Sequence, residues 1–228
     1  NGEGPAPLTP LKGMILMGKN PKVFIDGKGG VVGARLYEQL SRRSDLDFLI
    51  IDPEKRRDVE ERRKLLNEAD LAILCLPEET AAQAVELVDN PNTRIIDTSP
   101  AHRTTPGWVY GFAELLPGQR QRIRFSKRVA NPGCHASGFL STVAPLVQMG
   151  MLPPDYPVSC FSITGYSGGG KDMIAEFEDP NRDPALAAPA LYSLELRHNH
   201  LNEMQHIAGL EYPPVFVPIL SDMYSGMA

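Results

Sequence analysis

From residue 22 onward, short runs of apolar and β-branched residues alternate with stretches in which apolar residues recur every three or four positions. Runs of the first kind predict strands, and stretches of the second kind predict amphipathic helices. The expected strands are KVFID, DFLIID, LAILCL, TRIIDT and KRVAN, and the expected helices are GVVGARLYEQLSRR, RDVEERRKLLNEA and ETAAQAVELV. Because strands and helices alternate, the pattern predicts an α/β fold with a Rossmann-like parallel sheet.

This alternation ends near residue 150, where the proline-rich segment MLPPDYP interrupts it. Two further strand-like runs, VSCFSIT and VFVPIL, then flank a loop-rich section. Such a change of texture is typical of a domain boundary, which we place near residues 150–157. We also expect a flexible extension at the N-terminus, with Met14 or Met17 as the natural start. The expected units are residues 1–20, 21–152 and 153–228, the last with an α+β fold.

A glycine turn follows the first expected strand in VFIDGKGGVVGARL. A strand, a glycine turn and a helix start form the arrangement in which backbone N–H groups accept a pyrophosphate. The glycines Gly27, Gly30 and Gly33 are not spaced as in the standard dinucleotide fingerprint, so the context carries the prediction. We therefore expect residues 21–152 to bind a nicotinamide dinucleotide through these glycines, with Val31 and Val32 at the helix start.

The second expected strand ends at Asp52, some 20 residues after the turn, and basic residues follow it in PEKRRDVEERRK. An acidic residue at this place favours a free ribose hydroxyl, whereas basic residues favour a 2′-phosphate. Lys55, Arg56 and Arg57 therefore favour NADP over NAD. The alternative is that these side chains belong to an ordinary solvated helix face.

One of the three cysteines stands out from the other two by its surroundings. Cys75 and Cys160 lie in apolar strand-like runs, where cysteine usually serves as a small buried residue. Cys134 lies between the turn-forming NPG and a run with helical spacing from Ala136 to Met149. A helix N-terminus favours a thiolate, and its N–H groups, with the Asn131 side chain, could stabilise an oxyanion. The alternative is a buried thiol at a tight turn.

Composition narrows the possible partners and the compartment. The net charge of −5 argues against nucleic-acid binding, which needs a basic patch. Three widely spaced cysteines indicate neither a disulfide framework nor a metal site, and they are typical of a reducing compartment. No apolar run is long enough to cross a membrane, which takes about 18 residues. We therefore expect a cytoplasmic protein without a metal ion or a membrane partner.

Taken together, several strings resemble one family, the short form of N-acetyl-gamma-glutamyl-phosphate reductase. They are FIDGKGGVVG, IDPEKRRD, ADLAILCLPEE, IIDTSPAHRT, GWVYGFAEL, KRVANPGCHASGF, TGYSGGGKDMIAEFE and HNHLNEM. The family is similar in fold and chemistry to aspartate-semialdehyde dehydrogenases, and more distantly to phosphorylating glyceraldehyde dehydrogenases. In all of these a cysteine forms a thioester with the substrate.

The resemblance implies NADPH-dependent reduction of N-acetyl-glutamyl 5-phosphate to N-acetyl-glutamate 5-semialdehyde through a Cys134 thioester, a step of arginine biosynthesis. It also implies a homo-oligomer, either a dimer or a tetramer, and a second domain that continues past DMYSGM, so that this chain would be truncated at its C-terminus. Some positions depart from the family pattern, which would have Tyr-Pro-Thr at residues 135–137 and proline at Asn202. These departures concern the fit of the substrate rather than the nucleophile.

The resemblance also assigns roles to residues outside the cysteine turn. HNHLNEM would supply the acid/base histidine, His200 as the first choice and His198 as the second, whereas His102 and His206 would be packing or surface residues. Ser99 and Arg103 follow a strand, at the sheet edge where α/β proteins bind ligands, and the resemblance places both at the substrate; the alternative is a capping serine and a surface arginine. The glycine-rich loop would place Ser167, Gly168 and Gly169 against the cofactor, unless it is only a flexible hairpin end.

Three other functions are compatible with parts of this pattern. The first keeps the fold but acts on aspartyl phosphate. The second is a non-catalytic nucleotide-binding protein or scaffold. The third is a Cys-His acyl hydrolase, in which the glycine turn would have no purpose.

Overall fold

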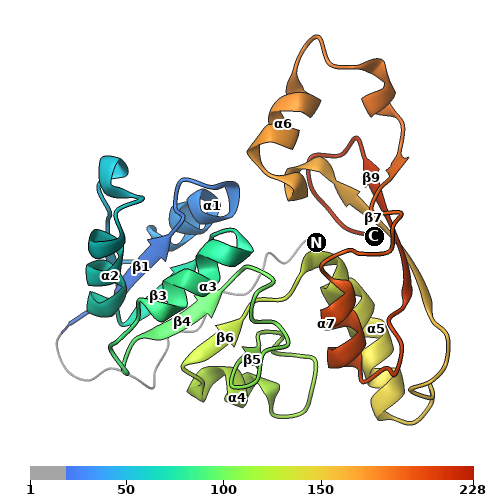
Figure 1. Cartoon of the computed structure of the whole chain (residues 1–228), viewed down its shortest axis with the longest axis horizontal. Coiled ribbons are helices and arrows are strands. Elements are labelled where there is room, and N and C mark those ends of the chain that lie inside the picture. Colours follow the sequence, from blue (N-terminus) through green and yellow to red (C-terminus); the bar gives the residue numbers. More distant parts are fainter. Residues whose placement is uncertain (1–18) are drawn as a thin grey trace, which may run out of the picture.

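The computed structural model describes residues 19–228, so almost all of the expected N-terminal extension lies outside the described residues. Figure 1 shows two lobes. The first holds a sheet with helices on both of its sides, and the second holds a smaller sheet, α6 and the packed helices α5 and α7. Within the described part of the chain, no helix is long and apolar enough to cross a membrane.

The first lobe is built on a six-stranded sheet in which every pairing is parallel, in the order β2-β1-β3-β4-β6-β5. This confirms the Rossmann-like fold that the sequence pattern predicts. The elements are β1 (Lys22–Asp26), α1 (Val31–Leu40), β2 (Asp47–Leu49), α2 (Val59–Glu68), β3 (Leu71–Leu74), α3 (Glu78–Glu86), β4 (Arg94–Asp97), β5 (Val109–Tyr110), α4 (Gln119–Phe125) and β6 (Arg128–Ala130).

Alternate side chains of β1 explain why helices cover both faces of this sheet. Successive residues of a strand point to opposite faces. Phe24 packs with the apolar sides of α2 and α3, whereas Val23 and Ile25 pack with α1 on the other face. A strand buried on both faces reads as a continuous apolar run, which is why KVFID predicts its strand to the residue.

One charged residue of the run PEKRRDVEERRK is not solvated. Arg62 on α2 is buried, and its Nε and Nη2 both donate to Oδ2 of Asp26, at 3.0 and 2.8 Å. The ion pair holds α2 against the end of β1. A charged run of this kind usually forms a solvated helix face, and Arg62 is an exception because its side chain points toward the sheet.

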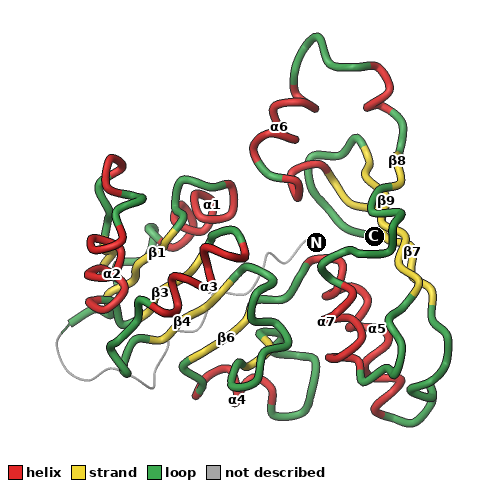
Figure 2. The backbone as a smooth tube through the Cα atoms, in the orientation of Figure 1, coloured by secondary structure: helices red, strands yellow, loops and turns green. Residues whose placement is uncertain are grey.

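The second lobe contains a three-stranded sheet in the order β7-β9-β8, with β7 parallel and β8 antiparallel to β9. Residues 227 and 228 pair with β7 at its other edge. Figure 2 shows that the path from α6 to α7 is mainly loop, interrupted by a short 3-10 helix and β8. The elements are α5 (Cys134–Gln148), β7 (Ser159–Gly165), α6 (Lys171–Glu178), β8 (Ala190–Leu191), α7 (Leu201–Ala208) and β9 (Val215–Ser221).

Helix α5 joins the two lobes. It follows β6 directly and packs against α7, and its buried residues share a core with Phe216 of β9 and with Tyr110 and Leu115 of the first lobe. The helix begins at Cys134, two residues earlier than its apolar spacing predicts. The expected nucleophile therefore occupies the first residue of the helix that links the lobes.

Candidate active site

The turn Asn131–Gly133 leads from β6 into α5 and presents Cys134 at the start of the helix. Cys134 is exposed, as expected of a nucleophile rather than of a buried thiol at a turn. Our expectation of a lowered thiol pKa is not met in this structure. Protein atoms packed around the sulfur raise the pKa of Cys134, and the backbone N–H groups of His135 and Cys134 oppose this effect without outweighing it.

Asn131, the second residue expected at the nucleophile, has an exposed side chain. Its amide nitrogen donates to the carbonyl oxygen of Pro132 at 3.1 Å, while its backbone N–H donates to the carbonyl of Asp97 at 2.7 Å. The backbone of this residue therefore ties the turn to the end of β4. The oxyanion role of its side chain stays a prediction.

His200 lies against the nucleophile turn. It is buried at the start of α7, and a Cβ atom built on Gly133 would lie only 2.5 Å from its Nε2. Its Nδ1 is buried and has no hydrogen-bond partner among the described residues. Burial, followed by the charges on neighbouring side chains, lowers the pKa of His200 to about 3, so the ring is neutral at pH 7.

The other histidine of HNHLNEM, His198, supports His200. Its Nδ1 accepts the backbone N–H of His200 at 3.1 Å, and the two rings lie 4.6 Å apart at a steep angle. His135 lies close to both rings but bonds elsewhere, to the hydroxyls of Ser162 at 2.7 Å and Tyr192 at 2.8 Å. Burial lowers the pKa of His135 to about 4. Tyr192, which we did not predict, therefore joins this histidine group.

A second residue that we did not predict, Glu203, lies at the centre of the site. Its carboxylate is 1% exposed, and it accepts hydrogen bonds from Arg103 at 2.6 Å, from the Tyr110 hydroxyl at 2.7 Å and from the backbone N–H of Gly133 at 3.0 Å. The signal in the sequence was its spacing: Glu203 follows His200 by three residues, which places both on one side of α7.

Ser99 and Arg103, the expected substrate residues, lie on the loop after β4. The Ser99 hydroxyl is buried and donates to Asp97 at 2.8 Å. Arg103 is also buried, which rules out the alternative of a surface arginine. Besides Glu203, it bonds the carbonyl oxygens of Asn131 at 3.0 Å and Thr98 at 3.2 Å. Arg103 thus holds this loop beside the nucleophile turn, whereas the Ser99 bond lies within the loop. The contact of both residues with substrate stays a prediction.

The glycine turn after β1 has the geometry expected of a phosphate cradle. Gly27 has a φ of +87°, and a Cβ there would lie 2.1 Å from the carbonyl oxygen of Cys75. A Cβ on Gly33 would lie 2.4 Å from the carbonyl oxygen of Gly27. Gly30 is the N-cap residue of α1 and has no side chain that could accept hydrogen bonds from the first turn of the helix. The backbone N–H groups of Val31 and Val32 are therefore accessible to a ligand. These residues therefore fit a dinucleotide.

The remaining cofactor residues lie in two other places. Arg56, with Lys55 and Arg57, is exposed after β2, where the Asp52 carboxylate accepts the N–H of Glu54 at 3.0 Å. Ser167, Gly168 and Gly169 form a 3-10 turn at the end of β7, beside α6 in the second lobe. Their contact with a cofactor stays a prediction, because these residues and the glycine turn belong to different lobes.

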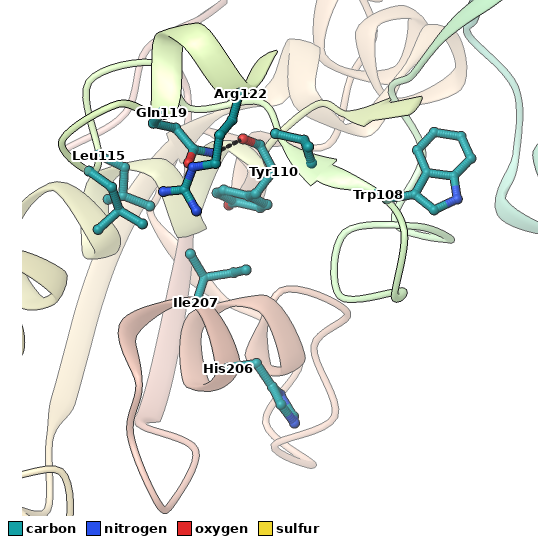
Figure 3. A pocket seen from close by; sticks show the side chains of 9 residues that line it. Trp108, Tyr110, Leu115, Gln119, Arg122, His206 and Ile207 are labelled. Carbon is teal, nitrogen blue, oxygen red and sulfur yellow. Dashed lines mark hydrogen bonds between the residues drawn. The ribbon is translucent and has the colours of Figure 1, made fainter. Parts of the chain in front are cut away.

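A pocket of about 260 Å³ lies between β5, α4 and α7 (Figure 3). None of the predicted catalytic or cofactor residues lines it. Tyr110 and Ile207 form part of its wall, together with Arg122 and Gln119, whose side-chain amide bonds the Tyr110 carbonyl. The pocket is therefore separate from the candidate active site.

A parallel sheet with a glycine turn, joined to an α+β lobe with an exposed cysteine at the junction, is the arrangement that places the chain in the class of semialdehyde dehydrogenases by the family comparisons. Two family descriptions agree: "Semialdehyde dehydrogenase, NAD binding domain" matches residues 51–123, and "Semialdehyde dehydrogenase, dimerisation domain" matches residues 134–228. The structure is similar to aspartate semialdehyde dehydrogenase II of Vibrio cholerae complexed with ASA (TM-score 0.60, 16% identity, 92% of this chain and 73% of that one). It is also similar to aspartate semialdehyde dehydrogenase with NADP from Candida albicans (TM-score 0.55, 12% identity, 91% and 69%).

The sequence comparison is more specific. N-acetyl-gamma-glutamyl-phosphate reductase of Brucella ovis is 47% identical over 209 residues, which are 91% of this chain and 67% of that protein. The chain belongs to the N-acetyl-gamma-glutamyl-phosphate reductase family. It spans 66% to 67% of the length of the curated relatives it matches.

Proposed function

We propose that the protein reduces N-acetyl-glutamyl 5-phosphate to N-acetyl-glutamate 5-semialdehyde, using NADPH and releasing phosphate. The observation that supports this proposal is the close approach of the His200 imidazole to Gly133, the residue that precedes Cys134 at the start of α5. A cysteine is suited to the reaction because it can displace phosphate and later leave again.

The thiolate of Cys134 attacks the acyl carbon, the carbon–sulfur bond forms, and the bond to the phosphate oxygen breaks. A nicotinamide cofactor bound at the glycine turn would supply the hydride needed to reduce the thioester. The negative charge that develops on the carbonyl oxygen takes a proton from His200, which takes it back as the carbon–sulfur bond breaks and the aldehyde forms. His198 holds His200 through its backbone.

His200 can perform this role only if its pKa rises when substrate binds. Burial and positive neighbours hold the pKa of His200 near 3 in the free protein. The carboxylate of the substrate stays in the site after phosphate has left, so it can bring negative charge near the ring in the later step, and a nearby opposite charge favours the imidazolium. We therefore propose that bound substrate raises the pKa of His200 into the range in which the ring can donate a proton. Ser99 and Arg103 would contact the substrate from the neighbouring loop.

For the cofactor, the glycine turn would hold the pyrophosphate, and Arg56 would contact the 2′-phosphate of NADP. Ser167, Gly168 and Gly169 would approach the nicotinamide end when the lobes enclose the ligands. The protein would also form a homo-oligomer through the second lobe, which matches a dimerisation domain and exposes apolar residues on one face of its sheet.

The test is an assay of N-acetylglutamate semialdehyde oxidation by the complete protein. The absorbance of the reduced nicotinamide measures the rate. We expect a reaction that requires both NADP and inorganic phosphate and that is lost in Cys134→Ser. Parallel assays with aspartate semialdehyde and with NAD decide the substrate and the cofactor. Preference for aspartate semialdehyde would replace the proposed substrate. Cofactor binding without turnover of either aldehyde would indicate a non-catalytic protein, and phosphate-independent ester hydrolysis would indicate an acyl hydrolase.

A further inference from the structure

We infer that Glu203 is a positioning residue that holds the turn before Cys134 in register with His200. The inference rests on the proposed role of Cys134 as the nucleophile. Glu203 lies on α7, one helical turn after His200, and its Oε1 is 3.9 Å from the imidazole Nε2. The same carboxylate reaches the residue that precedes Cys134, so a single side chain spans the acid/base and the nucleophile turn.

The turn is held at both of its ends by one ion pair. At one end, Arg103 Nε donates to the carbonyl oxygen of Asn131 at 3.0 Å. At the other end, the backbone N–H of Gly133 donates to Glu203 Oε2 at 3.0 Å. Arg103 and Glu203 bond each other at 2.6 Å, which closes the ring of contacts around Pro132. The position of the turn therefore depends on the carboxylate.

There is no space for a side chain at residue 133. A Cβ on this residue would lie 2.3 Å from Glu203 Oε1, 2.5 Å from His200 Nε2 and 2.7 Å from Arg103 Nη1. The turn is thus packed directly against three functional side chains. A shift of the Glu203 carboxylate would move the turn, and Cys134 with it, relative to His200.

Burial makes stability a poor explanation for this ion pair. Both Glu203 and Arg103 are buried, and an apolar pair of similar volume often stabilises a fold as well as a buried ion pair does. An electrostatic effect on the nucleophile does not explain the ion pair either. Arg103 lowers the thiol pKa of Cys134 and Glu203 raises it, so the two charges act in opposite directions. What the pair supplies is a fixed set of acceptors and donors for the backbone of the turn.

The test compares Glu203→Gln with Tyr110→Phe in the complete protein. An amide at residue 203 presents its NH₂ group either to Arg103 or to Gly133, so a donor faces a donor. Tyr110→Phe removes the hydroxyl bond at 2.7 Å from the same Oε2 but leaves the bond to Gly133 in place. We expect Glu203→Gln to lower kcat about 100-fold, the scale of a misplaced reacting group, with KM changed by less than about threefold. Tyr110→Phe should keep kcat within about twofold.

Two further measurements keep the test decisive. The plateau rate of Cys134 alkylation by iodoacetamide at high pH should fall in Glu203→Gln and not in Tyr110→Phe. On that plateau the thiol is fully ionised, so the effect of the Glu203 charge on the thiol pKa no longer changes the rate. This measurement reports the position of the turn even if the protein lacks reductase activity. Glu203→Asp keeps the charge, but its side chain is one methylene too short to reach both Arg103 and Gly133. We expect kcat to fall in this variant as well. It replaces Glu203→Gln in the test if the Gln variant does not fold. Equal kcat and equal alkylation in Gln and Phe variants, or full kcat in the Asp variant, would overturn the inference.

Discussion

Exposure, rather than acidity, distinguishes Cys134 from the other two cysteines. Partial desolvation by packed protein atoms raises the pKa of all three thiols, including that of Cys134, which is exposed as a whole residue, and it raises the pKa of Cys75 to about 11. Cys134 is exposed at a helix start, whereas Cys75 and Cys160 are partly buried in or beside strands. Its reactivity in the free protein therefore follows from access, and the helix N-terminus only reduces the cost of forming a thiolate in packed surroundings.

This difference predicts how alkylation of the protein depends on pH. Iodoacetamide should label Cys134 before Cys75 or Cys160, as mass spectrometry of digested protein can show. Because the pKa of Cys134 is raised, its thiolate fraction is small at pH 7, and the rate should increase through an inflection above the ordinary thiol value of about 8.5. A rate that levels off below that pH would support the lowered pKa that the sequence predicts, and first labelling of Cys160 would argue against Cys134 as the nucleophile.

At the level of single residues, the sequence indicates Cys134 and His200 as functional residues but not the side chains that hold them in place. Glu203 lies inside HNHLNEM, yet a charged residue in an amphipathic helix is usually solvated, so its burial was not predicted. Its partners Arg103 and Tyr110 are about a hundred residues away in the chain. Such a contact depends on how α7 packs against the first lobe, which no local pattern contains.

Among the elements, long buried ones are predicted well and short ones are not. The strands of the first lobe read as apolar runs because helices cover both faces of the sheet. We did not predict β5 or α6. β5 has only two residues, and its pairing with β6 defines it. α6 follows Gly170, whose φ of +87° starts the helix after a turn that the sequence indicates only as a loop.

The glycine turn before α1 offers a matched pair of substitutions. A Cβ on Gly33 would lie 2.4 Å from the Gly27 carbonyl oxygen and 2.8 Å from Cα of Lys28, so Gly33→Ala must push α1 away from the turn. A Cβ on Gly29 meets nothing within 4 Å. We expect Gly33→Ala to weaken NADPH binding at least about tenfold, or 1.4 kcal/mol, and Gly29→Ala to leave it unchanged. Fluorescence titration measures the NADPH affinity of both variants. Equal affinities in Gly33→Ala and Gly29→Ala would contradict the assignment of the cofactor pyrophosphate to this turn.

For the whole molecule, the second sheet presents its apolar residues outward. In β7, Phe161 is 69% exposed and Ile163 is 39% exposed, whereas Ser162 and Thr164, which alternate with them along the strand, are buried. The register places Val217 of β9 beside Phe161 and Ile219 beside Ile163, so the exposed face extends across the neighbouring strand. An apolar sheet face of this kind is typical of a surface that another protein element covers.

If a second copy of the chain covers this face, a charge placed in it should prevent association. Phe161→Glu puts a carboxylate at the centre of the face, where its burial against a partner copy would cost several kcal/mol, and we expect sedimentation to show a monomer. Phe125→Glu, on α4 in the other lobe, is the control, because Phe125 is 77% exposed and lies outside the face. This control should keep the oligomeric state of the unmodified protein.

Both variants should bind NADPH equally, since neither residue is near the glycine turn. An oligomer that persists in Phe161→Glu would show that the copies associate through another surface.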